Sequence, residues 1–256
     1  MNLFRVRGIL LAVHFSFFLM LGVVGWFGWQ EGAGVGLWWS VVTLLMFFTC
    51  VVLHELGHSF TAMHYGVNVR RILLMPIGGM AEFDGIPRQP VRELLITIAG
   101  PAVNFAIAGG LWLCFGISEL EVHPDRHFPT SAPEFVQVLL HWNLLMGCFN
   151  LVPVFPMDGG RIFRALLATR LNYLRATFIA ALVGKILAAS AFILAIYLFR
   201  AYLTAALFAF IFFAGEMEYR AVKRRDAEDA YWREVRAQLS MIPPPLKEPP
   251  LLEDLG

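Results

Sequence analysis

The chain alternates long apolar runs with short polar connections. A helix needs about 20 apolar residues to cross the roughly 30 Å hydrocarbon core of a bilayer, so each long run predicts a membrane-spanning helix. Six such windows lie near residues 8–29, 37–63, 94–117, 136–157, 178–199 and 201–217. The first exceeds the apolar core of about 7–15 residues found in signal peptides and lacks a small-residue cleavage motif, so we expect it to be retained. The pattern predicts an all-α polytopic helical bundle.

Polar residues dominate after the last window. Residues 217–240 place opposite charges three and four positions apart, which is typical of a solvated helix, and the proline-rich stretch IPPPLKEPP then ends it. We therefore expect a transmembrane domain at 1–217 and, at 218–256, a charged helix and tail too short for a folded regulatory domain. This helix could bind a partner, lie on the membrane surface or shield the inner loops.

Composition supports a membrane protein. Hydrophobic residues make up 58% of the chain, and the mean hydropathy is +0.65. The net charge of +1 and the absence of a basic stripe with interleaved aromatics argue against a nucleic-acid partner. Cys50, Cys114 and Cys148 all lie in apolar runs without a CxxC spacing, so we expect no disulfides.

The placement of charge predicts the orientation of the helices. Cytoplasmic loops are enriched in Lys and Arg. If the N-terminus is cytoplasmic and the chain crosses six times, 17 of the 20 Lys and Arg residues fall on the cytoplasmic side. We therefore expect a multi-pass protein of the cell membrane with both termini in the cytoplasm.

One apolar run carries an unusual set of polar residues, in the stretch CVVLHELGHSF. His54 and His58 are four positions apart, so on a helix their imidazoles face one point. Glu55 could take a proton from a water bound to the same ion, which is the HExxH arrangement of zinc hydrolases. The alternative is a chance match. An acidic residue at the bilayer centre costs about 2.5–3.5 kcal/mol, which argues against a glutamate without a function there.

A hydrolytic zinc site commonly has three protein ligands. The candidate for the third is Asp158, in FNLVPVFPMDGGR, where Pro153 and Pro156 break the helix and two glycines allow a tight turn. The alternative is a helix-end aspartate among the lipid headgroups.

Asn150 could bind the reacting carbonyl or bridge two helices. The remaining histidines are better explained as solvated, interfacial or packed: His14, His64, His123, His127 and His141.

These motifs together resemble the site-2 protease family of intramembrane zinc metalloproteases. The resemblance rests on HELGH, on NLVPVFPMDGGR, and on IAGPAVNFAIA, PIGGMAEF and VHFSFF, in the family's order. It implies one zinc ion held by His54, His58 and Asp158, with Glu55 as the general base. It also implies a glycine-containing loop or β-hairpin between the second and third spans. The chain resembles the compact branch without a PDZ domain, which is associated with bacterial membranes.

The family resemblance implies cleavage of a membrane-anchored regulatory protein in or near its transmembrane segment, with release of the cytoplasmic part. A substrate helix must unwind, and pairing with a strand at Gly78 and Gly79 would satisfy its freed backbone groups, although a plain turn is the alternative there. Asn104 is expected to bridge helices.

The rival functions are a zinc transporter, which would need a second polar cluster, and an inactive scaffold. The pattern selects no particular substrate or oligomeric state.

Overall fold

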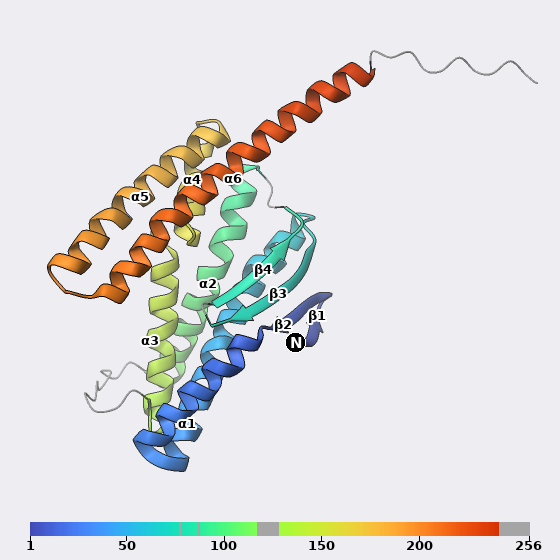
Figure 1. Ribbon diagram of the computed structural model, residues 1–256. Helices are drawn as coiled ribbons and strands as arrows, with labels where there is room; N and C mark the ends of the chain where they lie inside the picture. The colour runs from blue at the N-terminus through green and yellow to red at the C-terminus, as the bar shows by residue number, and fades with distance from the viewer. Residues whose placement is uncertain (77, 86–87, 117–127, 241–256) are drawn as a thin grey trace, which may run out of the picture.

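Figure 1 shows the computed structural model of the chain, a helical bundle with a small sheet. It describes residues 1–76, 78–85, 88–116 and 128–240, so His123, His127 and the proline-rich tail lie outside the described residues. In chain order the elements are β1 (Asn2–Val6), β2 (Ile9–Val13), α1 (Phe15–His64), β3 (Val69–Met75), β4 (Gly78–Phe83), α2 (Pro90–Phe115), α3 (Ala132–Asn150), α4 (Asp158–Ala168), α5 (Tyr173–Tyr197) and α6 (Tyr202–Ser240).

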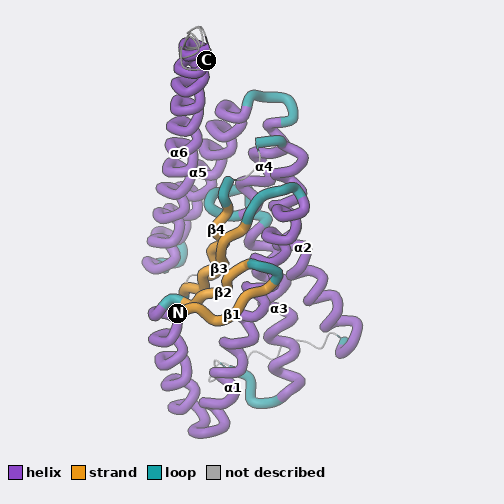
Figure 2. Tube along the Cα trace, turned by 90° about the vertical axis from the view of Figure 1, so that its right-hand side faces the viewer, coloured by secondary structure: helices purple, strands orange, loops and turns teal. Residues whose placement is uncertain are grey.

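Helix α1 consists of two arms joined by a reversal. The helical dihedrals are interrupted at Gly32 and Ala33, where Ala33 has φ 48° and ψ −131°, and both views show the chain folding back there (Figures 1 and 2). The arms touch at Gly28 and Gly36, since a Cβ atom on Gly36 would overlap the carbonyl oxygen of Gly28. Small residues at this crossing therefore let the two apolar arms pack closely.

The first predicted window, 8–29, is wrong at its start. The first helical arm begins at Phe15, and the residues before it form the hairpin β1–β2, in which Val6 pairs with Ile9. The two linking residues, Arg7 and Gly8, have φ of 47° and 94°. Two positive φ values in a two-residue loop are the geometry that matches the twist of paired strands. The residues Arg7 and Gly8 indicate a hairpin turn, but the predicted helical window began at residue 8 and ran through this turn.

The sheet has four strands in the order β1-β2-β3-β4, so an all-α description omits it. Strand β2 pairs parallel with β3, and α1 forms the connection between them, while β3 and β4 are antiparallel. One apolar cluster joins the sheet to the helices, with Ile9 and Ile72 packed among Leu56 of α1 and Ile96 of α2. In the strand order, β4 is one of the two edge strands of the sheet.

The helices are packed with small residues inside and large residues outside. Four of them, α1, α2, α5 and α6, are long and apolar enough to cross a membrane. In α5, for example, Ala180, Ala181 and Gly184 are buried while Ile186 and Ile193 are exposed. Lipid tails are as apolar as leucine, so helix association in a bilayer depends on close packing of small residues, and large side chains can face the lipid.

Two other predicted boundaries differ from the structure. The window 136–157 is helical only as far as Asn150, and turns fill 151–157 before α4 begins. The window 201–217 and the charged helix at 217–240 are one continuous helix, α6, which packs along α5 (Figures 1 and 2). Nothing in the 217–218 region interrupts the helical backbone, since Pro and Gly are absent between Met217 and Ser240.

A buried ion pair fixes α4 between α2 and α6. Arg164 of α4 donates from Nε and one Nη to Oε1 of Glu93 on α2, at 2.9 and 2.5 Å. Its other Nη donates to Glu218 of α6 at 2.6 Å. The side chains of Arg164 and Glu93 are only 3% and 0% exposed, so each charge depends on the other.

We predict that Glu93→Gln destabilises the protein by about 3 kcal/mol, at the low end of the cost of breaking a buried pair, because Glu218 remains beside Arg164. The thermal unfolding midpoint in detergent measures the effect. The matched control is Glu228→Gln on the exposed part of α6, where the described residues offer no ion pair. Equal midpoints for the two variants would contradict the anchoring role of this pair.

Candidate metal centre

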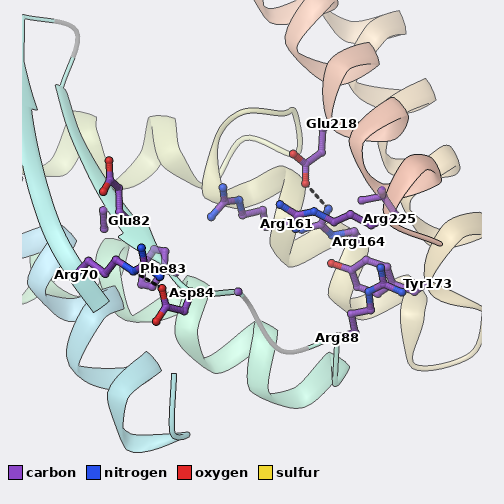
Figure 3. Close-up of a pocket in the computed structure, with 13 residues that line it drawn as sticks. Arg70, Glu82, Phe83, Asp84, Arg88, Arg161, Arg164, Tyr173, Glu218 and Arg225 are labelled. Carbon is purple, nitrogen blue, oxygen red and sulfur yellow. Dashed lines mark hydrogen bonds and ion pairs between the residues drawn. The ribbon is translucent and has the colours of Figure 1, made fainter. Parts of the chain in front are cut away.

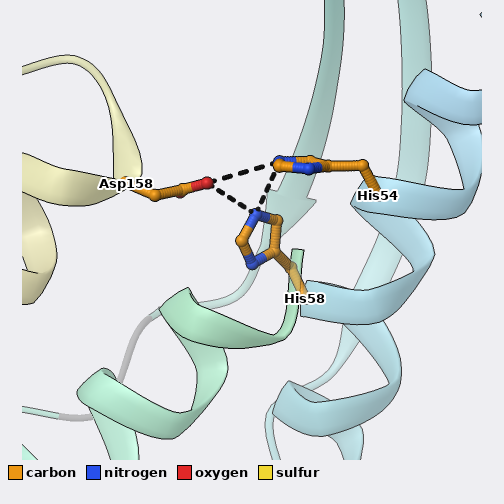
Figure 4. Close-up of side chains that lie close together, drawn as sticks. All are labelled: His54, His58 and Asp158. Atoms are coloured by element: carbon orange, nitrogen blue, oxygen red, sulfur yellow. Dashed lines mark hydrogen bonds and ion pairs between the residues drawn. The ribbon is translucent and has the colours of Figure 1, made fainter. Parts of the chain in front are cut away.

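His54, His58 and Asp158 meet at one point inside the bundle (Figure 4). The Nε2 atoms of the two histidines lie 3.1 Å apart. Oδ2 of Asp158 lies 3.3 Å from Nε2 of His54 and 3.2 Å from Nε2 of His58. All three residues are buried, and their ligand atoms lie within 4.8 Å of one another. The second arm of α1 thus presents two imidazoles to a carboxylate that is about 100 positions later in the chain.

Asp158 reaches this point because α4 starts there. It occupies the first turn of α4, immediately after the turns at 151–157 that contain Pro153 and Pro156. The expected tight glycine turn is not what the structure shows, since neither Gly159 nor Gly160 has positive φ. Instead a Cβ atom on Gly159 would overlap the carbonyl oxygen of Val152. The glycines let the preceding turns fold directly against the start of α4.

The hydrogen bonds of the outer ring nitrogens determine which side of each imidazole faces the centre. Nδ1 of His58 lies 2.8 Å from the carbonyl oxygen of Ile96. Nδ1 of His54 lies 2.6 Å from Oδ1 of Asn104. Both partners accept hydrogen bonds, so each neutral ring carries its proton on Nδ1 and turns the Nε2 lone pair inward.

With both rings neutral, three lone pairs therefore converge without a proton between them. Oδ2 of Asp158 is buried and has no hydrogen-bond partner among the described residues. A buried acceptor without a partner is costly, and two imidazole nitrogens with one carboxylate oxygen are the donor set of a three-ligand zinc site. The arrangement therefore fits a divalent cation held by His54, His58 and Asp158.

Asn104 orients His54, a role that sequence reasoning missed. Its amide nitrogen donates to Oδ1 of Asn143 on α3 at 3.0 Å, and Asn143 in turn donates to the carbonyl oxygen of Leu139 at 2.8 Å. This chain of bonds fixes Oδ1 of Asn104 as the group that faces His54. Asn104 does bridge helices as expected, but it also sets the tautomer of a candidate ligand.

Gly100 makes room for both imidazoles. A Cβ atom there would overlap Nε2 and Cε1 of His58 and lie 2.8 Å from Nε2 of His54. Ile96, Gly100 and Asn104 are spaced by four along α2, so one face of this helix supports the histidine pair. That spacing of four was the available signal in the sequence.

Glu55 lies beside the candidate ligands and against the edge strand. It is half-buried and close enough to interact electrostatically with His54, His58 and Asp158. A Cβ atom on Gly79 of β4 would lie 2.7 Å from Cγ of Glu55. Gly79 thus permits the strand to approach the carboxylate, while Gly78 begins β4 with φ 137° and has open space at its Cβ position.

The other predicted residues lie apart from this cluster. Asn150 is the half-buried last residue of α3, and its side chain has no hydrogen bond to another described residue. His14 is exposed and caps α1 by accepting from the backbone N–H of Ser16. His64 ends α1 beside the ring of Tyr65, and His141 bonds to the carbonyl oxygen of Gln137.

Comparison with known proteins places this geometry in a family. The model of peptidase family M50 matches residues 42–130 and 118–194. A zinc metalloprotease of Methanocaldococcus jannaschii is 37% identical over 245 residues, which cover 96% of this chain and 67% of that protein. Stage IV sporulation protein FB of Bacillus subtilis is 28% identical over 134 residues, which cover 52% of this chain and 43% of that protein.

A solved structure shares the fold. The site-2 protease from Methanocaldococcus jannaschii superposes with a TM-score of 0.59 at 37% sequence identity, covering 86% of this chain and 94% of that one. The matched segments include the two histidines, the glutamate and the aspartate described above. The chain belongs to peptidase family M50, the zinc metalloprotease family of the site-2 proteases.

Proposed function

We propose that this chain is an intramembrane zinc metalloendopeptidase. It hydrolyses a peptide bond in or near the transmembrane segment of a membrane-anchored regulatory protein and releases the cytoplasmic part. The observation that carries this proposal is the convergence of two imidazole nitrogens and one carboxylate oxygen beside the carboxylate of Glu55, within a chain whose helices are apolar enough to cross a bilayer. Membership of a zinc metalloprotease family supports it.

His54, His58 and Asp158 would hold the single zinc ion. A bound zinc ion supplies Lewis-acid chemistry that activates water and polarises a carbonyl group. The protein supplies the orientation of the ligands, because Ile96 and Asn104 hold both imidazoles in the tautomer that zinc requires.

Glu55 is the proposed general base and acid. Its carboxylate is next to the ligands but is not one of them, so it remains available for proton transfer. It takes a proton from the attacking water and then delivers that proton to the nitrogen of the departing amine. Each turnover returns Glu55 to its ionised form.

The edge strand β4 is the proposed binding surface for an unwound substrate. A substrate helix satisfies its own backbone, so its scissile bond becomes accessible only when those hydrogen bonds are replaced. Strand β4 is at the edge of the sheet and begins at Gly78, and Gly79 lets it pass close to Glu55. Pairing with β4 would replace the lost hydrogen bonds beside the carboxylate. Asn150 remains a proposed polar contact for the substrate.

The proposed topology has six crossings, with both termini in the cytoplasm of a bacterial cell. The two arms of α1 would provide two crossings and α2, α5 and α6 three more, and the 19-residue α3, which is not among the four candidate helices, would provide the sixth. The distribution of Lys and Arg supports this orientation. In it, α4 and the charged part of α6 lie on the cytoplasmic side, which is why the released product would be cytoplasmic.

A transporter is a weaker explanation of the same residues. Ion transport through the bundle would need successive polar sites along the path. Within the described parts of the chain, His54, His58 and Asp158 form the one group able to hold a metal ion. A single candidate metal site next to the carboxylate of Glu55 suits hydrolysis better than transport.

We predict that Glu55→Gln retains about one zinc ion per chain but cleaves a single-span reporter protein roughly 10²–10⁴-fold more slowly, the usual contribution of a general acid–base group. Metal analysis of the purified protein and product formation in detergent measure the two effects. His54→Ala should lose both zinc and cleavage. Undiminished cleavage by Glu55→Gln would remove this residue from the mechanism.

We also predict that Gly100→Ala weakens zinc binding by roughly tenfold or more, because the added methyl group displaces both imidazoles. The zinc retained after dialysis against a chelator measures the affinity. Gly109→Ala is the matched control, since it lies on the same helix with open space at its Cβ position. Equal zinc content in the two variants would show that the ligands lie elsewhere.

A further inference from the structure

A polar cavity of about 610 Å³ opens beside the metal centre, between β4, α4 and α6 (Figure 3). Five arginines and three carboxylates are among its lining residues. We call it the arginine cavity. Its arginines are Arg70, Arg88, Arg161, Arg164 and Arg225.

Three of these arginines are neutralised by carboxylates. Arg70 pairs with Asp84 at 2.5 Å. Arg88 pairs with Asp226 at 2.6 Å and with Asp229 at 3.1 Å. Arg164 is the buried anchor described above, held by Glu93 and Glu218. These pairs build the walls of the cavity, and Arg88 and Arg164 each face two carboxylates, so none of the three arginines is left to bind a ligand.

Arg161 and Arg225 are different. Neither has a carboxylate within ion-pair distance among the residues that the structure describes, and Nε of Arg161 is buried without any hydrogen-bond partner. In Figure 3 the Arg161 side chain extends from α4 toward the strands. A buried guanidinium nitrogen without an acceptor is an unusual feature that a bound acceptor would explain.

The edge strand links this cavity to the proposed scissile bond. Gly79 lies against Glu55, and Ala81, Glu82 and Phe83 of the same strand line the cavity. At about 3.3 Å per residue, the four residues from Gly79 to Phe83 span roughly 13 Å. A peptide paired with β4 at Glu55 would therefore enter the arginine cavity about two to four residues farther along.

We propose that the arginine cavity is a specificity subsite for acidic side chains of the substrate, on the cytoplasmic side of the scissile bond. This inference rests on the proposed protease function and names the substrate feature that Arg161 and Arg225 recognise. A guanidinium group binds a carboxylate through two parallel hydrogen bonds, which suits two unpaired arginines. A polypeptide is favoured over an anionic lipid headgroup because a strand edge leads from Glu55 into the cavity.

Binding without cleavage tests the inference. The full-length Glu55→Gln protein, loaded with zinc, is titrated with fluorescent single-span peptides in which an Asp–Asp pair is moved along the cytoplasmic flank. Asn–Asn peptides with the same positions are the reference. We expect about tenfold tighter binding of the Asp–Asp peptide at one or two positions, and a weaker preference at high salt.

Three variants test whether Arg161 and Arg225 cause the preference for Asp–Asp over Asn–Asn peptides. Arg161→Gln combined with Arg225→Gln should abolish it, and Arg225→Glu should favour a Lys–Lys peptide at the same positions. Arg224→Gln removes the same charge from α6 outside the cavity lining and should leave the preference intact. A preference that survives the double variant, or that falls equally with Arg224→Gln, would overturn the inference.

Two further results separate this inference from the protease proposal. If phosphatidylglycerol in phosphatidylcholine nanodiscs abolishes the Asp–Asp preference of the otherwise unchanged protein, an anionic lipid occupies the cavity and the inference is wrong. If the parent protein cleaves Asp–Asp and Asn–Asn peptides equally well, the inference fails while the protease proposal stands. Selective binding of Asp–Asp peptides by a chain that cleaves no peptide supports the subsite and contradicts the protease proposal alone.

Discussion

The convergence of two imidazole lone pairs and one carboxylate oxygen is the constraint on which the rest of the structure depends. Three buried acceptors 3.1–3.3 Å apart repel one another unless a cation or a proton lies between them, and their geometry fits a metal ion. Helices α2 and α3 hold the two imidazoles in this arrangement. Helix α2 supplies the acceptors for the outer ring nitrogens and the glycine that leaves room for the rings, and α3 orients the amide behind His54.

Packing in a bilayer makes such precision possible. Without water to drive apolar association, the helices hold together through close contact of small residues and a few internal polar bonds. Gly57 illustrates the contact, since a Cβ atom there would lie 2.7 Å from the carbonyl oxygen of Ala99 on α2. The same close approach that joins α1 to α2 also places the HELGH turn against Gly100. Helix association and ligand placement therefore depend on the same surface.

Local patterns predicted that the two histidines face one point, and they predicted the surrounding structure less well. The spacing of His54 and His58 needs only one helix, so their shared face followed from the sequence. The role of Asn104 depends on contacts with residues 39 and 50 positions away, and the Glu93–Arg164 pair joins residues 71 positions apart. No local pattern contains such contacts. The hairpin at Arg7–Gly8 was missed for another reason, since an apolar strand and the start of an apolar helix look alike over five residues.

Helix α4 combines three functions on successive turns. Asp158 points to the metal centre, Arg161 to the arginine cavity, and Arg164 to the buried carboxylate of Glu93. All three residues extend from one short helix, so the position of α4 sets where each side chain begins. The anchor at Arg164 therefore does more than stabilise the bundle. By fixing α4 relative to α2, it sets the distance between the carboxylate of Asp158 and the histidines that α2 supports, and with it the position of the cavity beside β4.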